Sequence, residues 1–287
     1  MQDQHLKNFF TLEKKQTLRE GYMSGRKNIN PTMRSAIVNW LYEILIENVI
    51  QRETIFLAIA ILDRYICIST NIDKNNFSLV GITCVWIASK FIETTWFSIE
   101  TCLEFCCNKY IRSDMELMEI EILTKLQWDI NFTTSYHFLK IFKQKFGLTK
   151  KEYRFCKYLL EFVQHHSVLM HYMPSALATT VICTMVTMNV TSNVDSVSDF
   201  EKEKTWNFYI SKTKILEATK QDASTIEECC GKLNILLLKE MILVFNKKEN
   251  NIKSVTQHYH DETNDGPSDK VYLWYNANDN LDDYECE

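Results

Sequence analysis

The stretch Met33-Arg34-Ser35-Ala36-Ile37-Val38-Asn39-Trp40-Leu41 decides the fold of this chain. Its apolar residues recur at helical spacing as far as Leu45, and Arg34 lies on the same stripe, three positions before Ile37. A lone charge on a buried helix face is costly, so Arg34 needs a partner of opposite charge. The next predicted helix carries one carboxylate on its own apolar face, Asp63. We expect the two residues to form a buried structural ion pair.

Composition indicates an almost entirely helical protein. The 287 residues include only 6 Gly and 3 Pro, whereas average usage is roughly 7% and 5%. Sheets and barrels need many turns, and turns are rich in these residues. The hydrophobic fraction of 46% is ordinary for a globular core, so the chain is not broadly disordered. Its length fits one large domain or two of ordinary size.

Charge and cysteine usage exclude several classes of protein. A net charge of −5 argues against nucleic-acid binding, which needs clustered Lys and Arg. No apolar signal run opens the sequence, and no segment approaches the roughly 18 apolar residues of a membrane span. The 10 Cys are scattered without a C-x-x-C motif, which is typical of reduced thiols in helix cores. We therefore expect a protein of the nucleus and cytoplasm.

Helical periodicity divides the chain into two sets of five segments. The first set covers 33–49, 53–69, 78–92, 98–108 and 113–127. The second set covers 134–146, 150–168, 174–190, 205–219 and 222–246. Their equal number and similar lengths suggest a duplicated five-helix unit. The expected domains are a leader or short helix at 1–20, an N-terminal unit at 21–131, a C-terminal unit at 132–246 and a flexible acidic tail at 247–287.

Two charged residues stand out within the apolar pattern of the first unit. The predicted helix 78–92 is apolar on nearly all sides and should be central, and Lys90 lies at its end. Glu119 is set within the apolar stripe of helix 113–127. Both side chains could emerge at one surface. Lys90 could equally be an ordinary lysine at a helix end, with Glu119 pairing with it internally.

Four motifs in order resemble a cyclin box. They are Met33-Arg34…Trp40-Leu41, Leu62-Asp63-Arg64, Leu79-Val80-Gly81…Ala88-Ser89-Lys90-Phe91-x-Glu93, and Met118-Glu119…Leu123…Leu126. In the second unit, Tyr172-Met173-Pro174-Ser175 resembles the start of a helix in mitotic, A/B-type cyclins. The resemblance covers about residues 20–245. It implies a divergent A/B-type cyclin, an all-α protein of two tandem five-helix cyclin folds with the flexible acidic tail.

The resemblance also implies a partner and a mechanism. Cyclins form heterodimers with cyclin-dependent kinases, and residues at the positions of Lys90 and Glu119 hydrogen-bond the kinase main chain near its αC helix. That contact moves the catalytic glutamate of the kinase inward, into the ion pair that phosphoryl transfer requires. Phe91, Glu93 and Leu123 are the further kinase-facing candidates. The chain would thus be a regulatory subunit that controls cell-cycle progression, with no catalytic residues, cofactor or metal of its own.

A second surface is implied on the helix that contains the opening stretch. Met33, Ile37 and Trp40 resemble a shallow apolar patch that docks Arg-x-Leu segments of substrates or inhibitors, with Glu43 as its anionic rim. Met33 and Trp40 could equally be core residues. Ala36 replaces the larger aliphatic residue common in the family, which weakens the case for peptide docking.

Several alternatives remain open at this stage. The run 92–99 has one acidic residue and no proline, unlike the family pattern, so a degenerate cyclin could bind a kinase without activating it. A double cyclin fold of the transcription-factor type would need a basic face and a zinc ribbon. A helical enzyme would need converging acid–base or metal groups, and we find neither. The histidines favour core or solvent positions over metal binding, namely His165, His166, His171, His258 and His260.

Overall fold

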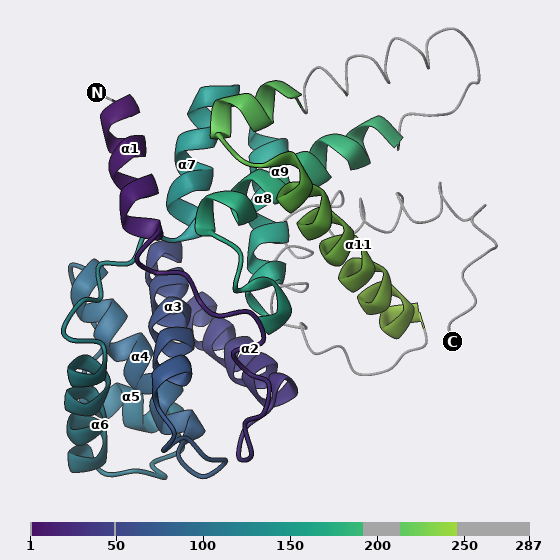
Figure 1. The fold of residues 1–287 in the computed structure, drawn as a ribbon. Helices are drawn as coiled ribbons and strands as arrows, with labels where there is room; N and C mark the ends of the chain where they lie inside the picture. Colours follow the sequence, from purple (N-terminus) through teal and green to yellow (C-terminus); the bar gives the residue numbers. More distant parts are fainter. Residues whose placement is uncertain (1, 49, 192–212, 246–287) are drawn as a thin grey trace, which may run out of the picture.

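The computed structural model describes residues 2–48, 50–191 and 213–245, and every regular element in these ranges is a helix (Figure 1). The all-α prediction is confirmed. The elements are α1 Gln2–Glu13, α2 Pro31–Glu47, α3 Arg52–Ile68, α4 Phe77–Ile92, α5 Ile99–Phe105, α6 Arg112–Lys125, α7 Ser135–Phe146, α8 Lys150–Gln164, the 3₁₀ helix η1 Ser167–Leu169, α9 Pro174–Thr191 and α11 Ala223–Phe245. Residues 213–219 are also helical.

The first fold is built around α4, which contacts α2, α3, α5 and α6. Its residues from Leu79 to Val85 are all buried, because apolar side chains surround the helix on every side. Gly81 lets α2 approach closely, since a Cβ at this position would lie 3.0 Å from Cγ2 of Ile37. The third helix of the first unit is therefore the centre of its bundle, as the sequence predicts.

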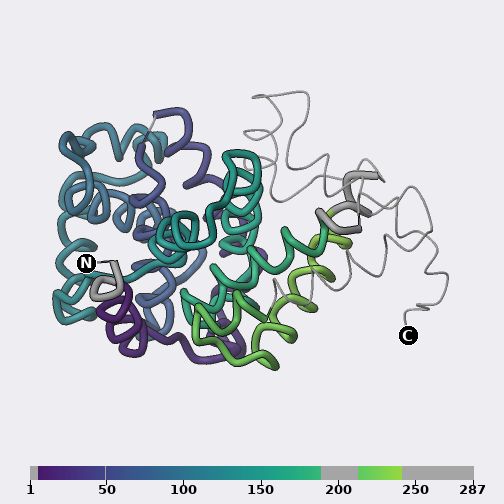
Figure 2. Tube along the Cα trace, turned by 90° about the horizontal axis from the view of Figure 1, so that it is seen from above, coloured from purple at the N-terminus to yellow at the C-terminus, as the bar shows by residue number. Residues whose placement is uncertain are grey.

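The second fold repeats this arrangement around α9, again the third helix of its unit. α9 contacts α7, α8 and α11, and its described core is apolar apart from a series of buried threonines. Thr179 satisfies its hydroxyl by donating to the Ser175 carbonyl one turn earlier, at 2.8 Å. Seen from above, the blue helices of the first fold and the green helices of the second lie side by side (Figure 2).

Local sequence explains where the helices begin and end. Asn30 accepts a hydrogen bond from the Met33 amide at 2.9 Å, and Pro31 occupies the first turn of α2. α7 ends at Gly147, whose φ of 62° is left-handed. α5 and α8 end earlier than the predicted ranges of 98–108 and 150–168. After α5 the backbone turns through the positive φ of Cys107, and after α8 it continues into η1.

The segment before the first fold is part of the structure rather than a separate leader. α1 packs on the second fold, where the rings of Phe9 and Phe10 contact Phe138. Glu13 is buried and accepts hydrogen bonds from the Ser175 amide and hydroxyl, at 2.9 and 2.7 Å. Residues 2–13 therefore form a helix that packs on the second fold. The predicted tail, 247–287, lies outside the described residues.

Buried charges hold the two folds together. Arg34 is fully buried and makes a bidentate pair with Asp63, with both distances 2.6 Å. Its third contact is to the second fold, where Nη1 donates to the Gln164 carbonyl at 2.7 Å. Nearby, Arg52 pairs with the buried Glu161 at 2.6 Å. Each of these charges has its partner, which buried ions require. The arginine of the opening stretch thus fixes α2, α3 and α8 relative to one another.

Candidate functional site

The end of α4 and the middle of α6 bring two predicted site residues together. Lys90 and Glu119 form an ion pair, and their side chains remain 31% and 18% exposed. The Lys90 ammonium also lies 3.5 Å from the centroid of the Trp86 ring, a cation–π contact. Trp86 is held in turn by a hydrogen bond from its indole N–H to the Phe97 carbonyl, at 3.1 Å. The lysine is therefore positioned by the fold and still reachable from outside.

An apolar hollow surrounds this ion pair. Its volume is about 390 Å³, and its lining is Ile87, Lys90, Phe91, Glu119, Ile120, Leu123, Trp128 and Ile130. Three of the lining side chains are unusually exposed for their size: Phe91 at 50%, Ile120 at 56% and Trp128 at 66%. Exposed apolar groups that gather around fixed charges are typical of protein–protein contact sites.

The sequence reasoning missed four residues of the hollow, namely Ile87, Ile120, Trp128 and Ile130. Trp128 follows α6 in a left-handed turn with φ of 61°, which turns its side chain back beside the helix that it follows. A tryptophan in the polar break 127–131 was the available signal. Ile120 lies off the apolar stripe of α6, next to Glu119, so periodicity marked it only as an exposed residue.

Glu93 has a different environment from the one expected of a kinase-facing residue. Its carboxylate accepts from the Gln51 amide at 3.0 Å, from the Gln51 side chain at 3.2 Å and from the Thr54 hydroxyl. It therefore satisfies donors at the start of α3, and it does not line the hollow. Unpaired backbone donors at a helix start attract a carboxylate, and no sequence pattern indicates that Glu93 would reach them.

The predicted docking patch lies on α2, where Ile37 and Trp40 approach Gly81 of α4. Met33, Ile37 and Trp40 are partly buried and pack against the core, so each has both a core contact and an accessible part. Glu43 is exposed and accepts a hydrogen bond from the Asn39 side chain at 2.8 Å. The patch is therefore partly accessible and has an acidic residue on the same helix.

The inter-fold histidines are core residues. His165 stacks on Tyr42 with ring centroids 5.2 Å apart, and its Nδ1 contacts the Glu161 carbonyl at 3.0 Å. Burial lowers the pKa of His165 to about 3 and that of His166 to about 4, so both are neutral near pH 7. Among the described residues, no group of three or more His, Cys, Asp or Glu could hold a metal ion. His258 and His260 lie outside the described residues.

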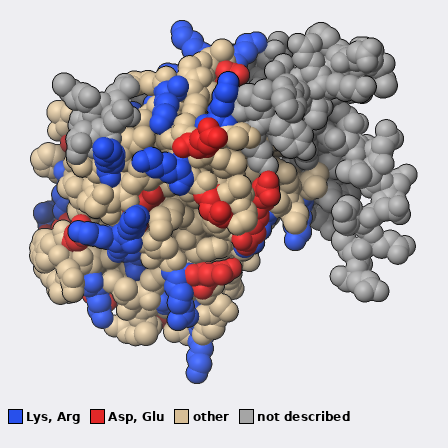
Figure 3. Space-filling model, turned by 45° about the horizontal axis from the view of Figure 1, so that its top comes forward, with Lys and Arg blue, Asp and Glu red and all other residues tan. Residues whose placement is uncertain are grey.

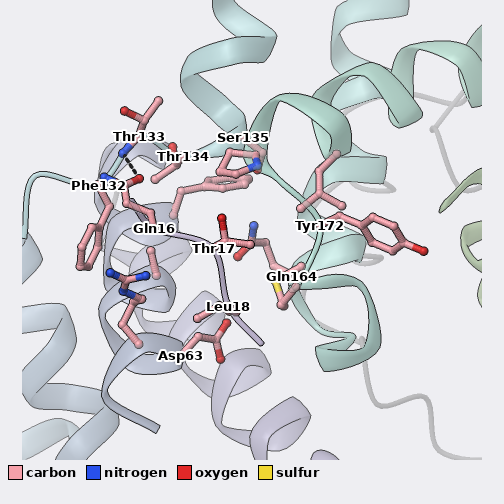
Figure 4. Close-up of a pocket in the computed structure, with 16 residues that line it drawn as sticks. Gln16, Thr17, Leu18, Asp63, Phe132, Thr133, Thr134, Ser135, Gln164 and Tyr172 are labelled. Atoms are coloured by element: carbon pink, nitrogen blue, oxygen red, sulfur yellow. Dashed lines mark hydrogen bonds between the residues drawn. The ribbon is translucent and has the colours of Figure 1, made fainter. Parts of the chain in front are cut away.

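A small cavity of about 80 Å³ lies between the two folds, under the segment that follows α1 (Figure 4). Gln16 closes it by donating to the Asn131 carbonyl at 3.1 Å and accepting from the Thr133 amide at 2.9 Å. Thr17 and the buried Gln164 face the same space. Most of the lining surface is apolar, and these few polar side chains lie at the joint between the two folds.

The surface charge and the hydropathy of the helices bear on two further kinds of partner, nucleic acid and membrane. Basic and acidic side chains are interspersed on the face shown in Figure 3, in contrast to the single-sign stripe of a nucleic-acid interface. None of the described helices is both long enough and apolar enough to span a membrane.

Two family models match the chain, one after the other. The model described as cyclin, N-terminal domain, matches residues 4–131, and that described as cyclin, C-terminal domain, matches residues 133–270. The first match includes most of α1. The boundary between the two matches falls in the linker between α6 and α7.

Curated relatives and solved structures agree with these matches. The chain is 30% identical over 172 residues to G2/mitotic-specific cyclin-B2 of Gallus gallus. The aligned region covers 60% of this chain and 43% of that protein. It is equally identical to G2/mitotic-specific cyclin-B of Marthasterias glacialis, over 60% of this chain and 44% of that one. The chain thus spans less than half the length of these relatives. A viral cyclin from herpesvirus saimiri has a similar fold, with a TM-score of 0.64 at 14% identity over 80% of this chain and 95% of that one.

Proposed function

The chain belongs to the cyclin family, and we propose that it is a regulatory subunit that binds a cyclin-dependent kinase and stabilises the active, αC-in state of that kinase. The observation that carries the proposal is the apolar hollow around the Lys90–Glu119 pair. A subunit of this kind has no chemistry of its own. It works by binding one kinase conformation more tightly than the other and so shifts the population toward the active one.

The electrostatics of the hollow suit a contact with main-chain groups. Lys90 offers ammonium donors to a carbonyl, and Glu119 offers carboxylate oxygens to an amide N–H. In the free chain these groups satisfy each other, so neither is left uncompensated before a partner arrives. Because the pair is partly exposed, opening it or sharing it with a partner costs little. The surrounding apolar side chains supply the burial that stabilises a heterodimer.

Trp128 should be the energetic centre of this contact, because large exposed aromatic side chains dominate many interfaces. We expect Trp128→Ala to weaken kinase binding by about tenfold or more. The matched control is Ile235→Ala, which removes a 53% exposed apolar side chain from α11 in the other fold and should leave binding unchanged. Pull-down of the recombinant chain with a panel of cyclin-dependent kinases identifies the partner. Titration of that partner then measures the kinase affinity of both variants. Capture of no kinase at all would contradict the proposal.

A kinase-binding chain that does not activate its partner is the second candidate, and the segment after α4 favours it. The Glu93 carboxylate already accepts hydrogen bonds at the start of α3, and Trp96 in the same segment is 55% exposed. Phe97 is anchored by Trp86 and by an edge contact to Phe105. A histone phosphorylation assay on the captured complex separates the two candidates. Activity above that of the free kinase supports activation, and binding without such activity supports the second candidate.

We also propose that the α2 patch docks Arg-x-Leu segments of substrates or inhibitors. The partly buried apolar side chains would receive the leucine, and Glu43 would attract the arginine. Glu43→Gln should weaken binding of a fluorescent Arg-x-Leu peptide about two- to fivefold, the range of an exposed ion pair. Glu47→Gln is the matched control, because Glu47 is exposed on the same helix. Equal effects of the two substitutions would count against the patch.

A further inference from the structure

A second cavity lies away from the kinase-facing hollow, between the loop that precedes α2 and the C-terminal end of α3. Its volume is about 490 Å³, and its lining is Arg19, Tyr22, Ser24, Gly25, Arg26, Lys27, Asn28, Ile29, Cys67, Thr70 and Ile72. Three of these eleven residues are cations and none is acidic. The cavity is therefore positively charged, although the net charge of the chain is −5. It shares no residue with the hollow around Lys90.

Arg26 is a preorganised cation in this cavity. Its Nη1 donates to the Ser69 carbonyl at 2.7 Å and its Nε to the Tyr22 carbonyl at 3.4 Å. These bonds hold Nε and Nη1, which point to different sides of the guanidinium group, and within the described residues Nη2 has no acceptor. A planar guanidinium held through two of its nitrogens presents its remaining donors in a defined direction, an arrangement that suits oxyanions.

The loop itself adds backbone donors. Gly25 has a φ of 75° in a tight turn, and the amides of residues 25–28 donate to no acceptor in the described parts of the chain. Hydroxyl and amide side chains stand beside them, from Ser24, Thr70 and Asn28. Arg19 and Lys27 are exposed at the same cavity. Several N–H donors close to three cations make a concave site for an anion.

We propose that this cavity binds the phosphate group of a phosphorylated protein segment. A phosphate monoester offers several strong acceptor oxygens and nearly two negative charges near pH 7, which matches three cations without a carboxylate. The cavity is larger than a phosphate group alone needs, so it has room for the residues beside the phosphate in the bound segment. Its one aromatic residue, Tyr22, is only 6% exposed, so no ring is available to stack on a nucleotide base.

The scarcity of glycine allows a direct binding test on the whole chain. Only 6 glycines are present, so glycine-selective ¹⁵N labelling gives a simple amide spectrum in which Gly25→Asn identifies the peak of the cavity. The probes are the peptide Ala-Ala-phosphoserine-Ala-Ala, the same peptide without phosphate, inorganic phosphate and AMP. We expect the phosphopeptide to shift the Gly25 peak in a saturable way. The peaks of Gly147 and Gly231 should not move.

Paired variants test whether the cavity's charges are responsible. Arg19→Gln with Lys27→Gln should weaken phosphopeptide binding about tenfold or more. Both side chains are exposed, so the fold should persist, as circular dichroism can verify. Lys125→Gln with Lys239→Gln removes the same charge from exposed positions elsewhere and should change the affinity by less than about twofold.

Four results would overturn the proposal. One is a Gly25 peak that no probe moves, and another is an equal loss of affinity in both paired variants. AMP binding as tightly as the phosphopeptide would assign the cavity to nucleotides instead. Inorganic phosphate binding as tightly as the phosphopeptide would show that no protein segment is recognised. None of these results depends on kinase binding, so the two proposals can fail separately.

Discussion

Asp63 is the counter-ion of the fully buried Arg34. It neutralises the fully buried Arg34 and accepts a hydrogen bond from the Tyr22 hydroxyl at 2.7 Å. Asp63→Ala leaves the arginine buried without compensation and should lower the free energy of unfolding by about 3–5 kcal/mol. Urea denaturation followed by circular dichroism measures the change. Glu100→Ala breaks an exposed bridge to Arg112 and should cost less than about 1 kcal/mol. A similar small cost at Asp63 would contradict this role.

His165 makes stability depend on pH. Burial lowers its folded-state pKa from 6.5 to about 3, so the unfolded chain binds the proton more readily than the folded one. Stability is therefore fully present above about pH 6.5 and falls as the pH drops toward 3. At pH 5 this histidine should cost about 2 kcal/mol relative to pH 7.5. His165→Phe keeps a ring against Tyr42, and its loss of stability between these pH values should be smaller by about that amount. An unchanged loss would contradict the assignment.

Residues on a periodic stripe could be predicted, and residues off it could not. Arg34 with Asp63 and Lys90 with Glu119 stand out because each is a charge in an apolar pattern, and the structure brings both pairs together. Trp128 lies in an irregular turn, where no periodicity indicates which way a side chain points. Glu93 accepts hydrogen bonds from Gln51 and Thr54, which are distant in sequence, so only the folded structure shows these contacts.

At the scale of elements, α2 packs closely against α4 because residue 81 is a glycine and has no side chain. A Cβ at Gly81 would meet Ile37 at 3.0 Å, whereas nothing lies within 4 Å of a Cβ at Gly231 on α11. Gly81→Val should therefore destabilise the protein by about 1–3 kcal/mol through overpacking. Gly231→Ala should stabilise it by about 0.5–1 kcal/mol. Urea midpoints of the two variants measure both effects, and a stabilising Gly81→Val would contradict the close approach.

The start of α3 gives a second test at this scale. Because Glu93 accepts from Gln51 and Thr54, Glu93→Ala should lower stability by about 1 kcal/mol, as the loss of a helix cap does. Its kinase affinity, measured by the same titration as for Trp128→Ala, should stay within about twofold of the wild type, a change well below 1 kcal/mol. Unchanged stability with a large loss of kinase affinity would restore the kinase-facing role expected from the sequence.

The helices themselves were largely predictable because apolar periodicity extends over whole turns. The predicted range 78–92 compares with Phe77–Ile92 for α4, and 113–127 compares with Arg112–Lys125 for α6. Errors came where the backbone leaves the helix without a proline or glycine to signal it, as at Cys107 after α5. The loop at residues 19–29, which lines the basic cavity, has no period at all and could be placed only by the structure.

For the whole molecule, two five-helix units with central helices α4 and α9 are joined by the buried charges near Gln164, and α1 packs on the second unit. This duplication was visible in the sequence only as equal helix counts, since residue similarity between the units is faint. The first unit carries both the hollow around Lys90 and Glu119 and the proposed docking patch on α2. Because both surfaces belong to one helix bundle, we expect them to keep a fixed relation when a partner binds.

The most direct test of the central claim is the phosphorylation of histone by a kinase that the chain captures. The assay compares the wild-type chain, Lys90→Ala with Glu119→Ala, and the matched control Glu228→Ala with Lys232→Ala, which removes an exposed ion pair from α11. We predict strong activation by the wild type and the control, and loss of activation by the first double variant with unchanged helicity. Full activation by that double variant would contradict the claim that the hollow around Lys90 and Glu119 is the kinase-binding site.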